Sequence, residues 1–106
     1  MNILEKIVAD RRKSLSADRA IADTFPARTL PVVPFFQNKK PFIIAECKKA
    51  SPAKGNLGAP NYKDLARDYY RGGVRHFSVL TERKYFKGSL RDLHELKTIS
   101  ALCFFA

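Results

Sequence analysis

An acid and a base stand two positions apart in the stretch IIAECKKASPAKG, residues 43–55, at the point where an apolar run ends. Glu46 and Lys48 would face the same side of an extended strand, because alternate residues of a strand point the same way. A carboxylate and an ammonium group held close together shift each other's pKa, and they can bind a substrate that has polar and anionic parts. An ion pair that only caps the strand explains the same spacing, so both interpretations stay open.

Other polar residues are less informative. Glu82 and Lys84 follow a second apolar stretch, HFSVLTE, and are expected at the same end of a second strand. Lys49 and Lys54 are interpreted as solvated loop charges.

The two histidines and two cysteines are too scattered to form a metal site or a disulfide framework. We predict that Cys47 faces the surrounding helices as a small core residue, since it alternates with Glu46 and Lys48. His76 is expected to face a packing site and His94 to lie on the polar side of a helix. The sequence therefore predicts no metal and a reduced protein, and its charged start is unlike a signal peptide, so we expect a cytoplasmic protein without membrane segments.

The elements that position these residues alternate between helix and strand. Apolar residues at helical spacing predict an amphipathic helix over about the first fifteen residues, and three prolines then predict a connecting arm laid against the core. The runs KPFIIAEC, HFSVLTE and ALCFFA predict three strands, the first covered on both faces. SPAKGNLGAPN and RKYFKG are predicted loops. The two intervening helices are expected to begin at caps and to carry apolar lines: Asn61, Gly72 and Gly73 bound the first, and Ser89, Asp92, Leu90, Leu93, Leu96 and Ile99 belong to the second.

This order predicts right-handed βαβ units and a parallel sheet, hence an α/β fold. Long loops after parallel strands are the functional side of such folds, so Glu46 and Lys48 are expected at the functional edge.

Charge offers a competing function. Twenty Lys and Arg residues against ten Asp and Glu give the chain a formal charge of +10, which attracts polyanions. Tyr69, Tyr70, Tyr85 and Phe86 could stack on bases, so a small basic nucleic-acid-binding module is the alternative. The basic residues are spread over every segment and no nucleic-acid-binding motif is present, so nucleic acid is not the partner that we favour.

Three blocks resemble one enzyme family. IIAECKKASPAKG and SVLTERKYFKGSLRDL resemble the first- and second-strand signatures of indole-3-glycerol-phosphate synthase, and ILEKIVADRRKSL is similar to that family's extra N-terminal helix. The resemblance extends to about Leu102. It implies a TIM (β/α)₈ barrel, no cofactor, and ring closure with decarboxylation of 1-(2-carboxyphenylamino)-1-deoxyribulose 5-phosphate in tryptophan biosynthesis.

The resemblance also implies roles for particular residues. Glu46 matches the strand-one glutamate that orients the catalytic lysine, and Lys48 matches the lysine that binds the anionic substrate. Ser51 matches a serine beside the substrate phosphate. Leu80 and Phe86 match an apolar pocket and an aromatic residue that pack against the substrate's ring.

The family's third strand ends in a catalytic lysine, where this chain reads ALCFFA. We therefore expect one partial barrel domain, residues 1–106, truncated after about strand three. Its expected parts are an extra helix over 1–18, an arm over 19–40 and the first βα units over 41–106. Alone it is expected to be inactive, and its open strand edges favour self-association or a companion fragment.

Overall fold

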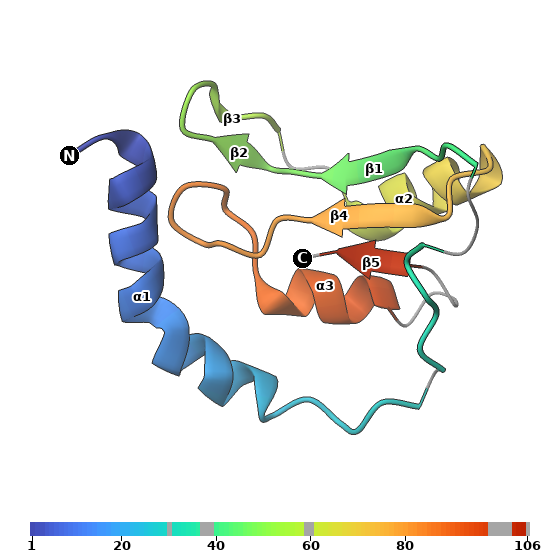
Figure 1. Cartoon of the computed structure of the whole chain (residues 1–106), viewed down its shortest axis with the longest axis horizontal. Helices are drawn as coiled ribbons and strands as arrows, with labels where there is room; N and C mark the ends of the chain where they lie inside the picture. Colours follow the sequence, from blue (N-terminus) through green and yellow to red (C-terminus); the bar gives the residue numbers. More distant parts are fainter. Residues whose placement is uncertain (30, 37–39, 59–60, 98–102, 106) are drawn as a thin grey trace.

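The part of the chain that the structure describes forms three helices, a parallel sheet and a small hairpin (Figure 1). A computed structural model describes residues 1–29, 31–36, 40–58, 61–97 and 103–105. Along the chain come α1 (Ile3–Ala22), β1 (Ile44–Cys47), β2 (Ala50–Ser51), β3 (Gly55–Asn56), α2 (Tyr62–Arg71), β4 (His76–Val79), α3 (Leu90–Lys97) and β5 (Cys103–Phe105). The predicted alternation of strands and helices is confirmed.

The main sheet has the strand order β1-β4-β5, and both pairings are parallel. Glu46 lies beside Ser78 in the register, and Cys47 lies beside Val79. The three strands point the same way in Figure 1, so the loops that follow β1 and β4 leave the sheet at one edge, on the side where α1 stands. The predicted parallel α/β arrangement is therefore present.

One face of this sheet forms the core. Ala45 and Cys47 of β1 and Phe77 and Val79 of β4 are buried, and they pack with Tyr62, Ala66 and Leu96 from α2 and α3. Cys47 thus faces the helices as predicted. The opposite face is open at β1, where the Ile44 side chain is 48% exposed. The prediction that this strand is covered on both faces is wrong for the described residues, since the helices pack against one face only.

The predicted caps of the later helices are largely confirmed. The Asn61 side chain accepts hydrogen bonds from the backbone N–H groups of Lys63 and Asp64 at 2.9 and 3.3 Å. Ser89 Oγ accepts the backbone N–H of Asp92 at 3.1 Å, but the Asp92 carboxylate bonds Lys49 instead of completing the cap. After α2 the chain turns through Gly73, whose φ of 102° is readily adopted only by glycine.

Three boundaries differ from expectation. α1 continues to Ala22, beyond the predicted end at residue 18, and β1 begins only at Ile44. The predicted loop after β1 contains the antiparallel β2–β3 hairpin, whose two-residue strands are too short to produce an alternating pattern. Ile99 of the predicted apolar line, and Leu102 and Ala106 at the chain's end, lie outside the described residues.

The arm between α1 and β1 contacts the body through aromatic rings. The Phe25 ring stacks on His94, with centroids 4.3 Å apart, so His94 lies against the arm and not on a purely polar surface. His76 packs against Phe42 and shares a 2.7 Å hydrogen bond with the Phe35 carbonyl oxygen, in a packing site as predicted. Phe36 stays 78% exposed, so the arm is laid against the core only in part.

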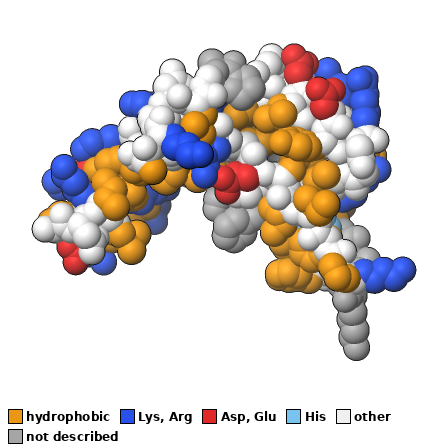
Figure 2. Space-filling model, turned by 90° about the horizontal axis from the view of Figure 1, so that it is seen from above, with side chains coloured by type: hydrophobic (Ala, Val, Ile, Leu, Met, Phe, Trp, Pro, Cys, Tyr) orange, Lys and Arg blue, Asp and Glu red, His pale blue; other side chains and the backbone are white. Residues whose placement is uncertain are grey.

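Most of the apolar stripe that predicts α1 does not face the body, although Ile7 is half-buried. Ile3, Leu4, Val8 and Leu15 are all exposed. Figure 2 shows hydrophobic side chains on the surface at the α1 end of the molecule, among Lys and Arg side chains. Among the described residues no helix is both long enough and apolar enough to cross a bilayer.

Candidate functional site

The acid and the base that open the sequence analysis lie side by side. Lys48 Nζ is 2.8 Å from Glu46 Oε1, with Glu46 near the carboxyl end of β1 and Lys48 directly after the strand. The Glu46 side chain is 47% exposed and that of Lys48 33% exposed, so both groups are open to a ligand. The strand's alternation explains this placement, since Ala45 before Glu46 and Cys47 after it are buried in the core. The predicted juxtaposition is confirmed, whereas the roles of the two residues stay predictions.

The pairing of β1 with β4 places Leu80 near Lys48. The backbone N–H of Leu80 donates to the Cys47 carbonyl oxygen at 3.2 Å, which continues the β1–β4 pairing one step beyond β4. In this register Leu80 lies opposite Lys48, on the same open face as Glu46 and Ser78. That Leu80 lines a substrate pocket beside the ion pair stays a prediction.

Ser51 lies in the β2–β3 hairpin, which follows β1 at the same edge (Figure 1). Its hydroxyl oxygen accepts the backbone N–H of Lys54 at 3.1 Å and so fixes the hairpin turn. The turn also needs Gly55, whose φ is 63°. In this structure the Ser51 side chain therefore has a local structural contact.

Phe86 lies in the loop between β4 and α3, which Glu82 organises from within. The Glu82 carboxylate accepts the backbone N–H groups of Lys84, Tyr85 and Phe86 at 2.8, 2.7 and 3.2 Å. Glu82 therefore follows β4 as expected, and its side chain stabilises the loop. Phe86 is half-buried on this loop.

Lys84 points away from the strand ends toward α1. Its ammonium group is 2.7 Å from Asp10 Oδ2, and this contact raises the pKa of Lys84 while lowering that of Asp10. Sequence spacing offers no signal for such a long-range contact.

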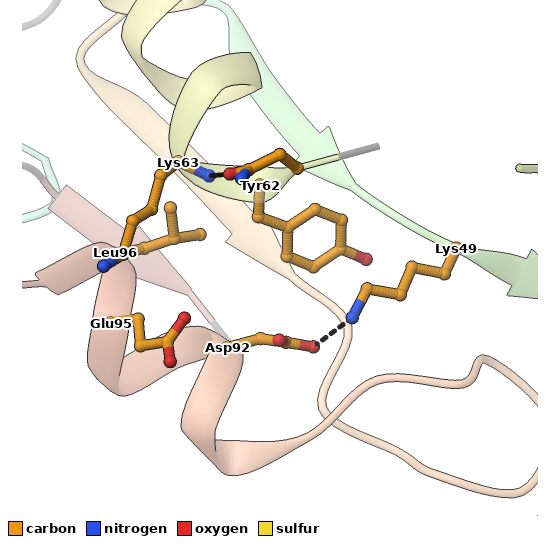
Figure 3. Close-up of a pocket in the computed structure, with 7 residues that line it drawn as sticks. Lys49, Tyr62, Lys63, Asp92, Glu95 and Leu96 are labelled. Atoms are coloured by element: carbon orange, nitrogen blue, oxygen red, sulfur yellow. Dashed lines mark hydrogen bonds and ion pairs between the residues drawn. The ribbon is translucent and has the colours of Figure 1, made fainter. Parts of the chain in front are cut away.

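A second polar cluster lies on the helix side of β1, between α2 and α3 (Figure 3). Lys49 Nζ is 3.0 Å from Asp92 Oδ2 and 4.7 Å from the centre of the Tyr62 ring. The expectation that Lys49 is a solvated loop charge is wrong, because its side chain is only 29% exposed and is paired. This contact connects the residue after Lys48 to α3, and so it holds the backbone next to the Glu46–Lys48 pair in place.

The pocket in Figure 3 has a volume of about 200 Å³. Burial, followed by the nearby Asp92 carboxylate, raises the pKa of Tyr62, and the Tyr62 hydroxyl has no hydrogen-bond partner among the described residues. Burial also raises the pKa of the adjacent core thiol, Cys47, to about 11, so this cysteine is a poor nucleophile at neutral pH. The lining residues are Lys49, Asn61, Tyr62, Lys63, Asp92, Glu95 and Leu96.

In the described part of the chain, no group of three or more His, Cys, Asp or Glu side chains is arranged to hold a metal ion. Two of the four aromatic residues that the nucleic-acid alternative needs, Tyr70 and Tyr85, make contacts within the protein. The Arg75 guanidinium lies 3.7 Å from the centre of the Tyr70 ring, and the Tyr85 hydroxyl donates to Asp10 at 2.5 Å.

A parallel sheet backed by helices, with a cation, a carboxylate and an apolar residue at its carboxyl edge, defines an α/β protein of the βα-repeat class with a strand-end site. Residues 4–105 match the family model described as indole-3-glycerol phosphate synthase, and the chain belongs to that family. The family implies the TIM-barrel fold, and the described sheet and helices are compatible with part of such a barrel.

Curated relatives agree with this membership. An indole-3-glycerol phosphate synthase of a Nocardioides species is 40% identical over 108 residues, covering 92% of this chain and 41% of the relative. That of Dechloromonas aromatica is 36% identical and covers 95% of this chain and 44% of the relative. That of Aquifex aeolicus is 51% identical over a shorter match, 52% of this chain and 21% of the relative. The chain thus spans less than half the length of these relatives.

Proposed function

We propose that this chain supplies the first βα units of an indole-3-glycerol-phosphate synthase barrel, in which Glu46 and Lys48 belong to the active site. The 2.8 Å ion pair at the carboxyl edge of a parallel sheet is the observation that carries the proposal. Two exposed charges in water gain little stability from pairing, so stability alone is a weak reason to place them there.

The proposed substrate, 1-(2-carboxyphenylamino)-1-deoxyribulose 5-phosphate, carries a phosphate and a carboxylate. Lys48 provides the cation that binds these anionic groups, and Glu46 holds the lysine in place and orients a second, catalytic lysine. Ser51 lies beside the phosphate, where its hydroxyl donates a hydrogen bond to a phosphate oxygen. Leu80 and Phe86 form the apolar wall for the substrate's ring.

The full reaction closes the indole ring with loss of carbon dioxide and water. Groups that polarise a carbonyl and transfer protons lower such barriers by about 10²–10⁴-fold each. The proposal therefore needs strands beyond the three described, because a barrel forms its pocket only when it closes. The matched segment covers 41% of the Nocardioides relative and 44% of the Dechloromonas relative, in keeping with a partial barrel that is inactive alone.

The open face and strand edges of this sheet also favour association with a second copy or with a companion segment. The exposed Ile43 and Ile44 side chains support this part of the proposal. Light scattering of the purified chain tests it, and a strictly monomeric chain at high concentration would contradict it.

Complementation of a tryptophan-requiring strain tests the catalytic proposal. One plasmid encodes this chain alone, and a second encodes the chain joined after β5 to the remaining barrel of the Nocardioides relative. We expect growth without tryptophan only from the chimera. Growth from the chain alone would contradict the requirement for further strands.

Purified chimeras then test the two site residues. Lys48→Met and Glu46→Gln are each expected to lower kcat/KM by about 10²-fold or more, since each removes a charge from the pocket while nearly keeping its volume. Lys54→Met is the matched control, a lysine of the same loop with an exposed side chain. Equal activity of the Lys48 and Lys54 variants would refute the assignment.

A further inference from the structure

α1 turns a polar side toward the rest of the protein. Its less exposed residues recur at helical spacing and include four polar ones, while four of its large apolar residues face solvent. Asp18 is the one buried residue of the helix, at 7% exposure. A carboxylate is costly to bury without partners, so this orientation must come from specific contacts. The less exposed residues are Ile7, Ala9, Asp10, Arg11, Ser14, Asp18 and Ile21.

The contacts of α1 converge on consecutive residues of the β4–α3 loop. Asp10 accepts hydrogen bonds from Lys84 Nζ at 2.7 Å and from the Tyr85 hydroxyl at 2.5 Å. Arg83 reaches Asp18 with its Nη2 atom 2.9 Å from Oδ1. Three neighbouring side chains of one loop are thus held by two carboxylates of one helix.

Contacts within α1 orient the carboxylate of Asp18. Arg11 pairs with Asp18 and also donates to Ser14 Oγ at 3.2 Å, so a line of polar side chains along α1 is joined before the loop is reached. Isolated surface ion pairs contribute little, but pairs that share partners and include a buried carboxylate form a network in which each bond orients the next.

We propose that α1 positions the β4–α3 loop at the strand-end site, with Asp10 and Asp18 as its positioning residues. Glu82 folds the loop from within, and the two aspartates fix it from outside through the residues that directly precede Phe86. The link from loop to substrate rests on the proposed function, whereas the link from α1 to the loop does not. Neither aspartate contacts substrate in this proposal; each acts through the loop.

Amide hydrogen exchange of the chain, measured by NMR without substrate, tests the first link. Asp10→Asn and Asp18→Asn are each expected to speed exchange of the Tyr85 and Phe86 amides by about tenfold, because each removes charge-assisted hydrogen bonds from the network. Core amides in β4 should keep their protection, which shows that the variants fold. Tyr85→Phe, which deletes one hydroxyl, is a milder variant that should move the same amides less.

Asp68→Asn is the matched control, since this carboxylate forms an exposed pair within α2, with a side chain that is 75% exposed. Reversing the charges in Asp10→Lys with Lys84→Asp should restore slow exchange, a rescue that a merely helix-stabilising role of Asp10 would not give. Unchanged loop exchange in Asp10→Asn, or failure of the reversed pair to rescue, would overturn the proposal.

The chimera tests the second link. Asp10→Asn there is expected to raise KM about five- to tenfold with a smaller change in kcat, because a loosened loop weakens substrate binding. Faster loop exchange with unchanged KM would overturn the link to the site while leaving the α1–loop contact intact. An inactive parent chimera would instead count against the proposed function, and the exchange result would stand.

Discussion

Replacing Gly88 by alanine would put a methyl group where the backbone of Leu80 already lies. A Cβ built on Gly88 is 1.7 Å from the Leu80 carbonyl oxygen and 2.6 Å from its carbon. Because a carbon and an oxygen rarely approach closer than about 3.3 Å, the two backbone segments must separate by roughly 1.5 Å. No rotamer change relieves this clash, since both contacting groups are backbone.

That separation also stretches the 2.9 Å hydrogen bond from the Gly88 N–H to the Glu82 carbonyl oxygen, which closes the β4–α3 loop. Overpacking and one lost backbone hydrogen bond together predict a loss of about 2–4 kcal/mol in the free energy of unfolding. This is a large share of the stability of a small domain. The loop that carries Phe86 should also move away from Leu80.

Urea denaturation followed by circular dichroism measures the loss, and amide chemical shifts of residues 82–88 report the loop's displacement. Gly72→Ala is the matched control. A Cβ on Gly72 would be 3.4 Å from its nearest neighbour, and its φ of −77° suits alanine, so this variant should be neutral or more stable by about 0.4–1 kcal/mol. Equal stability of the two variants, with unchanged loop shifts in Gly88→Ala, would refute the close approach.

Two further predictions concern the core and the α1 contact. Leu96→Ala should cost about 2–5 kcal/mol in urea unfolding because Leu96 is fully buried between helix and sheet, whereas Leu57→Ala, at a side chain 45% exposed, should change stability by no more than about 0.5 kcal/mol. For pH, bonds to Lys84 and Tyr85 lower the pKa of Asp10 below its ordinary value of 3.8, so its stabilising contribution is complete above that value and is lost as pH falls through the lowered pKa. The pKa of Lys84 is raised above 10.5, so the stabilising contribution of its ammonium group is complete below pH 10.5 and is lost only at more alkaline pH. An NMR titration measures this. Lys84 resonances that change neither in acid, where Asp10 is protonated, nor in alkali, where Lys84 is deprotonated, would contradict both predicted pKa shifts.

Local signals along the chain predict much of the fold. The caps at Asn61 and Ser89 depend on hydrogen bonds within four residues, so their residue types are enough to place the two helix starts. Glu46 and Lys48 come together because a strand's period of two is a local property. The parallel sheet follows from the alternation of strands and helices, because a helix that connects two neighbouring strands returns the chain so that both strands run the same way.

Contacts between segments that are distant in the sequence could not be predicted from local patterns. Asp18 looks like any helix surface residue until Arg83 approaches from the β4–α3 loop. Lys49 looks solvated until α3 brings Asp92 to it. Most of the apolar stripe of α1 does not face inward, because the side of the helix that carries Asp10 and Asp18 contacts Lys84 and Arg83 of the β4–α3 loop.

The inward polar face of α1 has a thermodynamic consequence. Since most of its hydrocarbon is already in water, releasing the helix from the loop would hydrate few additional apolar groups. The heat-capacity increment rises with newly exposed apolar area, so detachment should raise it very little. Added salt, which weakens charge attraction, is the variable that should separate the helix from the sheet while the rest of the molecule stays folded.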